Sequence, residues 1–202
     1  MYRKDRREEY FTQKSKKEGY PARSVYKLKE IDEKFKIFRK GDSVLDLGSS
    51  PGSWLLYISQ KIGAEGKVVG FDIQDVDLKS QNNNITFIKK SILELENSDF
   101  PIQKFDSVVA DLSPNTSGIK SIDSGRSLEL SEKAFAIAKN HLLKNGSFIC
   151  KIFQGDGMDG FLKDISDNFR ILKRVKPRAV IKTSKEFYIV AKGFFPVDMP
   201  EA

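Results

Sequence analysis

The sequence predicts an α/β fold whose core is a mostly parallel β-sheet with helices on both faces. Short apolar runs alternate along the 202 residues with segments of helical period, as they do in parallel sheets whose strands are linked by helices. Polar residues and glycines also stand where these runs end, and ligands of open α/β sheets bind beyond the carboxyl ends of the strands. The length suggests one domain with a substantial core.

The expected elements follow in chain order. The first is a helix at 24–36 with Ser24 as its N-cap. Its apolar residues recur at helical spacing: Val25, Leu28, Ile31 and Phe35. The later elements are a strand at 43–47, a helix at 53–62, strands at 67–72, 85–88 and 105–111, a helix at 124–143, a strand at 147–153, a helix at 158–168, and strands at 171–175 and 186–194.

Composition is typical of a globular protein, with 39% apolar and 31% charged residues. No run approaches the roughly 20 apolar residues that span a bilayer, so no membrane partner is expected. The N-terminus, MYRKDRREEYF, lacks the apolar region of a signal peptide. A cytoplasmic location is therefore expected.

The single cysteine and the single histidine narrow the possible chemistry. Cys150 excludes an internal disulfide and, within the apolar run FICKIF, is expected to be a buried inert thiol. With His141 alone, a histidine-based triad or a zinc site is disfavoured. No metal site is predicted.

The net charge of +7 is unevenly distributed. Residues 1–40 contain 14 Lys/Arg and 7 Asp/Glu, and residues 163–192 contain 9 and 3, whereas residues 41–162 contain 12 and 16. Basic clusters attract polyanions. A solvated lysine-rich surface would give the same numbers, so charge alone leaves both interpretations open.

The segment VLDLGSSPGSW at 44–54 indicates a strand, a glycine turn and a helix start. Gly48 and Gly52 permit close approach of a ligand to the backbone, and Asp72 ends the next strand, where an acidic residue accepts hydrogen bonds from a ribose. A dinucleotide site favours G-x-G-x-x-G, and Pro51 removes one N–H that a pyrophosphate would need. S-adenosylmethionine, which has a ribose but no phosphate, fits this turn better. A purely structural turn is the alternative.

Other polar residues at predicted strand ends are Asp46, Asp111 and Glu186. Lys151 interrupts the apolar run FIC–IF, where a charge is costly unless it is paired or belongs to a site. A side chain that reaches water from a sheet edge is the alternative for this lysine.

Five stretches resemble one enzyme family, and together they extend from about residue 20 to 194. They are RSVYKL (23–28), LDLGSSPGSW (45–54), VVADLSPNTSG (108–118), CKIFQGDG (150–157) and SKEFYIVAKG (184–193). The sequence resembles the FtsJ-like family of RNA ribose 2′-O-methyltransferases. The resemblance implies a single-domain, Rossmann-like S-adenosylmethionine methyltransferase fold, with a mostly parallel seven-stranded sheet and an antiparallel last strand.

The resemblance also implies functional residues. The family's catalytic Lys–Asp–Lys–Glu tetrad corresponds to Lys27, Asp111, Lys151 and Glu186. Its contacts to S-adenosylmethionine correspond to Gly52, Trp54, Asp72 and Asp111, to which the glycine turn adds Gly48. The family usually has an acidic residue after the third strand, near the adenine, where this chain has Ser91. Serine can still accept a hydrogen bond, and Glu94 is an alternative from the next turn.

The residue types of this tetrad suit methyl transfer to a hydroxyl group. A ribose hydroxyl is a weak nucleophile and must lose its proton to attack a sulfonium methyl group in line. A neutral lysine amine can accept that proton, or an ammonium can stabilise the developing alkoxide, and burial or a second cation favours either role. Lys27 can supply the second charge, while Asp111 and Glu186 position the amines.

The resemblance implies RNA as the partner, most of all ribosomal RNA in an assembled large subunit, methylated to 2′-O-methyluridine. The compact chain looks more like the bacterial type than the longer eukaryotic relatives, and a monomer is expected. Transfer RNA or another RNA is the nearest alternative substrate, and a non-catalytic RNA-binding ribosome-assembly factor is the alternative class. Base methylation is disfavoured because the loop at Asp111–Asn115 lacks an aromatic residue, and a nicotinamide oxidoreductase is disfavoured by the turn spacing.

Three parts of the chain are expected: a basic N-terminal arm at 1–22, the methyltransferase domain at 23–196 and a C-terminal tail at 197–202. The expected RNA face contains basic residues that precede the tetrad: Arg3, Lys4, Arg6, Arg7, Lys14, Lys16, Lys17, Arg23, Arg178, Lys182 and Lys185. Tyr10, Phe11 and Tyr20 lie among them and either stack on bases or pack onto the fold.

Overall fold

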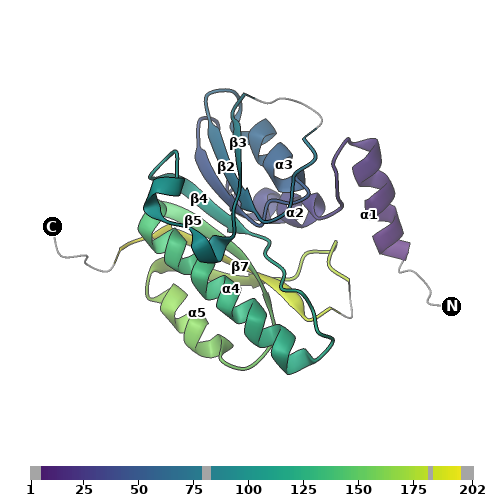
Figure 1. Cartoon of the computed structure of the whole chain (residues 1–202), viewed down its shortest axis with the longest axis vertical. Helices are drawn as coiled ribbons and strands as arrows, with labels where there is room; N and C mark the ends of the chain where they lie inside the picture. Colours follow the sequence, from purple (N-terminus) through teal and green to yellow (C-terminus); the bar gives the residue numbers. More distant parts are fainter. Residues whose placement is uncertain (1–5, 79–82, 182–183, 197–202) are drawn as a thin grey trace.

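A seven-stranded sheet with helices on both sides forms the core of the computed structural model, which describes residues 6–78, 83–181 and 184–196 (Figure 1). The strands are β1 (Ser43–Leu47), β2 (Lys67–Asp72), β3 (Ile85–Lys89), β4 (Phe105–Ala110), β5 (Leu142–Phe153), β6 (Phe169–Val175) and β7 (Glu186–Phe194). Their order across the sheet is β3-β2-β1-β4-β5-β7-β6, and only β7 runs antiparallel to its neighbours. The predicted fold class is confirmed, including the antiparallel last strand.

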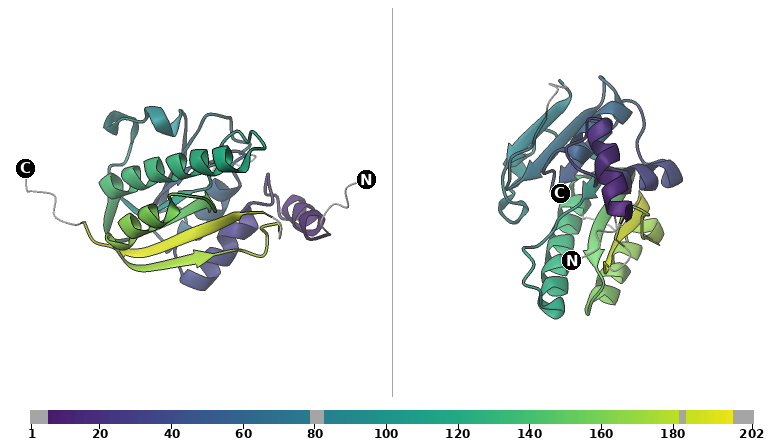
Figure 2. Two further views of the ribbon diagram at one scale, coloured as in Figure 1. Left: turned by 90° about the horizontal axis from the view of Figure 1, so that it is seen from below. Right: turned by 90° about the vertical axis from the view of Figure 1, so that its right-hand side faces the viewer.

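The helices cover the two faces of this sheet. They are α1 (Arg6–Lys17), α2 (Val25–Phe35), α3 (Ser53–Ile62), α4 (Lys120–His141) and α5 (Met158–Ser166), with short 3-10 helices η1 (Ile92–Glu94) and η2 (Asn97–Asp99). Figure 2 shows α4 and α5 on one side of the strands and α2 on the other, and α3 packs on β1 and β2. Across the described ranges, no helix combines the length and apolar character needed to cross a membrane.

Strand alternation divides the core into two clusters. In β4, Val108 and Ala110 belong to the cluster beneath α4 and α5, whereas Val109 belongs to the cluster beneath α2 and α3. Because successive side chains of a strand point to opposite faces, Lys151 of β5 shares its face with Ile149, which packs in the α2 and α3 cluster. The alternation therefore directs Lys151 toward the face that α2 covers.

Asp32 fixes the end of α2 against α3. Its buried carboxylate accepts hydrogen bonds from the N–H groups of Ile37 (3.0 Å) and Phe38 (3.1 Å) and from the hydroxyl of Tyr57 (2.7 Å). Burial, and then this carboxylate, raises the pKa of Tyr57 well above its usual value. The contacts set the position of α2, the helix that carries Lys27. At its other end, Ser24 occupies the predicted N-cap position but makes no side-chain capping bond.

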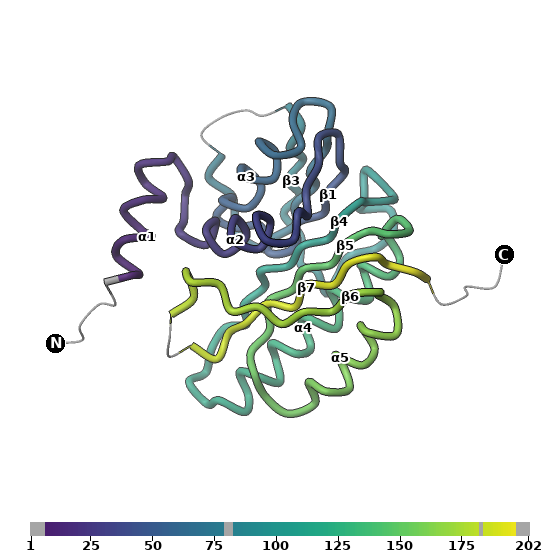
Figure 3. Tube along the Cα trace, turned by 180° about the vertical axis from the view of Figure 1, so that it is seen from behind, coloured from purple at the N-terminus to yellow at the C-terminus, as the bar shows by residue number. Residues whose placement is uncertain are grey.

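The first helix of the fold lies in the basic segment that was expected to be an arm, and it packs beside α2 (Figure 3). The Phe11 ring lies 5.2 Å from the Tyr26 ring, Tyr20 is buried, and Glu8 pairs with Arg23 at 2.9 Å. Packing onto the fold is thus the observed role of Phe11 and Tyr20, while Tyr10 is 57% exposed.

Two other observations concern the predicted boundaries. The helix expected at 124–143 begins earlier, at Lys120, because the Asp123 carboxylate accepts N–H groups of Ser117 (2.7 Å) and Gly118 (3.2 Å) and so orders the chain before it. Arg3, Lys4, Lys182 and the tail at 197–202 lie outside the described residues, so the division into arm, domain and tail stays a prediction.

Candidate active site

Strand register gathers the predicted tetrad at the carboxyl edge of the sheet. β4 and β5 run parallel and end there, with Ala110 paired to Cys150. β7 runs the other way and begins there, so Glu186 pairs with Phe153, and Tyr188 pairs with Lys151. Asp111 directly follows β4, and α2 supplies Lys27 from the adjacent face.

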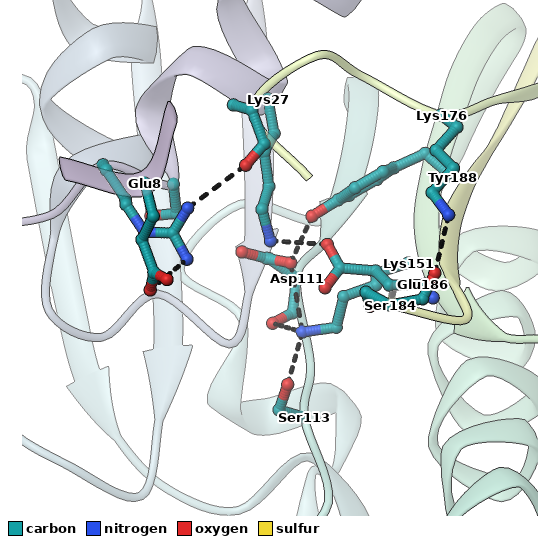
Figure 4. A network of polar contacts seen from close by, with 12 residues as sticks. Glu8, Lys27, Asp111, Ser113, Lys151, Lys176, Ser184, Glu186 and Tyr188 are labelled. Atoms are coloured by element: carbon teal, nitrogen blue, oxygen red, sulfur yellow. Dashed lines mark hydrogen bonds and ion pairs between the residues drawn. The ribbon is translucent and has the colours of Figure 1, made fainter. Parts of the chain in front are cut away.

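The four predicted residues form two ion pairs. Lys151 Nζ lies 3.2 Å from Asp111 Oδ1 and donates a hydrogen bond of 3.0 Å to the Asp111 carbonyl. Lys27 Nζ lies 2.5 Å from Glu186 Oε1. Lys151 is only 5% exposed, which excludes the alternative of a side chain extended to water. Figure 4 shows the two pairs side by side.

Tyr188 connects the two pairs, and it was not among the residues predicted from the sequence. Its buried hydroxyl donates to Asp111 Oδ1 at 2.7 Å, and Lys27 Nζ lies 5.7 Å from the centre of its ring. A sequence signal for it exists: Tyr188 follows Glu186 by two residues in a strand, so both point to the same face.

Ser113 is a second site residue that was not predicted. Its hydroxyl lies 2.5 Å from Lys151 Nζ, closer than either Asp111 oxygen. Ser113 stands in a loop, where no periodicity indicates side-chain direction, so only its position two residues after Asp111 could have suggested the contact.

The pKa shifts follow from this arrangement. Burial alone would raise the pKa of Asp111, but the charges of Lys151 and Lys27 and the Tyr188 hydroxyl bring it below its usual value. Burial, together with the charges of Asp111 and Glu186, raises the pKa of Tyr188 well above its usual value. Asp111 is therefore ionised at neutral pH and Tyr188 keeps its proton.

A hollow of about 600 Å³ lies beside Asp111 at the same edge of the sheet. Gly48, Asp72, Ser91 and Asp111, all predicted cofactor residues, contribute to its wall. Gly48 has φ of 84°, and a Cβ atom there would lie 3.0 Å from the Leu112 side chain, so the turn depends on glycine. The hollow can accept a ligand of nucleoside size.

Asp72 and Ser91 make local contacts within this wall. The Asp72 carboxylate accepts the N–H groups of Ser50 (2.9 Å) and Gln74 (2.8 Å). Ser91 accepts the N–H of Leu93 at 3.3 Å and so begins η1. Glu94, the alternative to Ser91, is exposed and does not contribute to the wall.

Gly52 and Trp54, also predicted cofactor residues, do not line the hollow. Gly52 precedes α3 with φ of 107°. Trp54 is buried, donates its indole N–H to the Ser24 carbonyl at 3.0 Å and places its ring 6.0 Å from that of Tyr188. A direct cofactor contact of these two residues stays a prediction.

Asp46 is a buried acid in the same region. It is fully buried, and neither carboxylate oxygen has a hydrogen-bond partner in the described part of the chain. Burial, and then the negative charges of Asp111 and Asp72, raises its pKa well above the usual value. Asp46 does not line the hollow, whose wall contains the carboxylates of Asp72 and Asp111. These two carboxylates suit a ligand that carries positive charge.

Comparison with known proteins gives a matching family and several similar proteins. Residues 20–194 match the family model described as FtsJ-like methyltransferase. The chain is 45% identical over 184 residues to "Ribosomal RNA large subunit methyltransferase E" of Desulfatibacillum aliphaticivorans, covering 90% of this chain and 88% of the relative. It is 43% identical over 196 residues to the protein of the same name from Nitratidesulfovibrio vulgaris strain DP4, with 95% of each covered.

A solved structure agrees with the fold. A protein described as a ribosomal RNA methyltransferase from Plasmodium falciparum superposes with a TM-score of 0.74 at 25% identity, covering 87% of this chain and 98% of that one.

The burial of Asp46 predicts a measurable stability effect. Because its pKa is raised in the folded protein, Asp46 contributes stability at low pH, and that contribution is lost as the pH rises above the pKa of about 3.9 that an unfolded aspartate has. Asp46→Asn should therefore raise the free energy of unfolding of the ligand-free protein by about 1–3 kcal/mol at pH 8, and by less at pH 5. Urea unfolding at both pH values measures this.

The exposed Asp77 provides the matched control, since Asp77→Asn should leave stability unchanged at both pH values. A loss of stability in Asp46→Asn at pH 8 would show that the carboxylate is paired in the folded protein.

Proposed function

The chain belongs to the FtsJ-like methyltransferase family, and we propose that it transfers a methyl group from S-adenosylmethionine to a ribose 2′-hydroxyl of RNA. The observation that carries the proposal is the buried Lys151–Asp111 pair, which stands beside a hollow of nucleoside size and next to a second lysine–carboxylate pair. A buried lysine within reach of a ligand site is a suitable group for moving a proton at a hydroxyl.

The hollow has features that suit S-adenosylmethionine. When bound, this cofactor supplies a methyl group on a positively charged sulfur. Asp72 would hold the ribose hydroxyls, Gly48 permits close approach of the backbone, and the ionised Asp111 provides negative charge. Ser91, in the place of the usual acidic residue, would contribute an uncharged contact to the adenine.

The two lysines act on the acceptor hydroxyl in this proposal. The Lys151 amine accepts the hydroxyl proton or, as an ammonium, stabilises the oxygen as negative charge develops. Asp111 holds Lys151 in place, and Glu186 holds Lys27, whose charge lies close enough to lower the pKa of Asp111. Holding the hydroxyl in line with the methyl group contributes a large part of the rate.

The RNA would approach over α1 and the start of β7. Lys16 and Lys17 of α1 are exposed, as are Arg178 and Lys185 near Glu186. Two further hollows that contain Arg174 and Lys185 adjoin this side, and one of them reaches Glu186. Cationic side chains on both sides of the tetrad suit a phosphate backbone that passes across it.

We infer from the names of the relatives that the substrate is large-subunit ribosomal RNA. From the family resemblance we also propose that the methylated nucleotide is a uridine in the assembled subunit. The proposed enzyme works as a monomer in the cytoplasm. Transfer RNA is the nearest alternative substrate because its methylation would use the same chemistry. Incubation with labelled S-adenosylmethionine and whole large subunits, naked ribosomal RNA or transfer RNA distinguishes these substrates, and nuclease digestion identifies the methylated nucleoside.

Lys151→Ala tests the catalytic assignment in the same assay. Loss of a group that moves a proton should lower the rate of methyl transfer by about 10²- to 10⁴-fold. Calorimetry should show that the variant still binds S-adenosylmethionine. Because truncation leaves Asp111 buried without its cation, Lys151→Met with Asp111→Asn is the second variant. Near-normal turnover in a folded variant would contradict the assignment.

Asp72→Ala tests the cofactor site. Loss of a charge-assisted hydrogen bond to the ribose should weaken S-adenosylmethionine binding by about 1.5–3 kcal/mol, measured by calorimetry. Asp75, exposed three residues further on, gives the control Asp75→Ala, which should keep the original affinity. Equal affinities of the two variants would remove Asp72 from the site.

Lys16→Gln with Lys17→Gln tests the RNA face. Each lysine–phosphate contact that is lost should make the dependence of log affinity on log salt shallower by about 0.7–0.9. RNA affinity should fall at low salt, while cofactor affinity and melting temperature stay the same. Lys67 and Lys144, exposed near the opposite edge of the sheet, give a double control with the same change in charge. If both pairs change the slope equally, α1 has no specific contact with RNA.

A further inference from the structure

The Lys151 amine is held by three oxygens that come from two residues. Three oxygens lie within 3.2 Å of it: the Asp111 carbonyl (3.0 Å), Asp111 Oδ1 (3.2 Å) and Ser113 Oγ (2.5 Å). An ammonium has three N–H donors, so these three oxygens match its full capacity. Two of them belong to one residue, and Ser113 alone holds the amine from another direction.

Asp111 holds the amine through two of its oxygens, and one of these two has a second partner. Its Oδ1 atom also accepts the Tyr188 hydroxyl at 2.7 Å. Ser113 makes the shortest of the three contacts, and the described residues give its hydroxyl no other hydrogen bond. Lys151 is therefore the hydrogen-bond partner of this hydroxyl among the described residues.

Ser113 also stands where the amine faces the ligand. Asp111 and Ser113 both line the 600 Å³ hollow, whereas Lys151 does not. Ser113 is exposed and Lys151 is 5% exposed, and Figure 4 shows the Ser113 hydroxyl in contact with the amine, so Ser113 joins the buried amine to the wall of the hollow. Pro114 follows it and restricts its backbone to extended conformations, which leaves the side-chain torsion as its main freedom.

We propose that Ser113 is a positioning residue that holds the Lys151 amine at the mouth of the cofactor hollow, where the acceptor hydroxyl must arrive. The inference rests on the proposed function for its catalytic consequence, but not for the contact itself. The hydroxyl can accept from an ammonium or donate to a neutral amine, so it holds Lys151 in either protonation state. The acceptor thus meets a fixed amine at any stage of the proton transfer.

Ser113→Ala should lower kcat by about 10- to 100-fold, as expected for loss of a hydrogen bond to a charged group at a reacting centre. The KM values for S-adenosylmethionine and RNA should change less than twofold, because Ser113 acts through Lys151. Ser113→Thr, which keeps the hydroxyl and adds an exposed methyl group, should restore most of kcat. Ser121→Ala, at an exposed serine in the first turn of α4, is the matched control.

Crystal structures of the wild type and of Ser113→Ala test the contact without any RNA. Lys151 Nζ should move by about 1 Å or occupy two positions in the variant, a displacement large enough to account for the loss of rate. If Lys151 keeps its position in Ser113→Ala, or if kcat is unchanged, the proposal is overturned. A weaker affinity for S-adenosylmethionine with unchanged kcat would also overturn it, because Ser113 would then serve the cofactor.

The two proposals fail in different ways. If the wild type methylates no RNA, the proposed function fails, yet the crystal structures still judge the contact between Ser113 and Lys151. If the wild type is active and Ser113→Ala is equally active, the positioning role alone fails.

Discussion

An amine inside an apolar strand needs a partner, and Asp111 is the partner that the sheet brings to Lys151. Asp111 directly follows β4, and Lys151 follows the residue of β5 that pairs with Ala110, so their meeting follows from the register of these parallel strands. Burial penalises both charges, and removing either would leave the other uncompensated. The antiparallel strand β7 must also begin at this edge, because only then does Tyr188 reach Asp111 and Glu186 reach Lys27.

Other contacts of the fold position the remaining parts of the site at that edge of the sheet. Asp32 anchors the end of α2 to α3, which sets the helix from which Lys27 reaches Glu186. Gly48 turns the chain away from β1 close to Leu112, which opens space for a ligand next to Asp111. The site therefore consists of side chains that project from fixed elements, with the loop from Asp111 to Ser113 as its least regular part.

Much of this could be predicted from the sequence, because strands and their ends have a clear signal. Alternation and apolar runs located all seven strands, and the position of Lys151 within such a run marked it as a residue of a site. The resemblance to a family supplied Lys27 and Glu186, which no local pattern distinguishes from surface residues. The structure brings all four together, although their catalytic roles stay predictions.

The remaining contacts depend on tertiary geometry that a linear pattern does not contain. Ser113 and Tyr188 contact the tetrad because of a loop path and a strand pairing across the sheet. The sequence predicted only a basic arm where helix α1 lies, because most residues of α1 are charged or polar. Few of its residues pack against the fold, Phe11 and Ser15 among them. Trp54 presents the opposite case, because its motif indicates a cofactor contact while its indole N–H is engaged with Ser24.

The uneven charge along the chain has a structural explanation in this arrangement. The acidic central segment supplies Asp72 and Asp111 to the wall of the hollow, whereas the basic N-terminal segment supplies Lys27 and the exposed lysines of α1. A cationic small ligand and a polyanion can therefore bind to opposite sides of one tetrad without competing for the same charges. Asp111 contributes to both sites: it lines the hollow and pairs with Lys151, and the charge of Lys27 lowers its pKa. The ionised Asp111 carboxylate therefore has two roles. It suits a positively charged ligand in the hollow, and it compensates the charge of the buried Lys151.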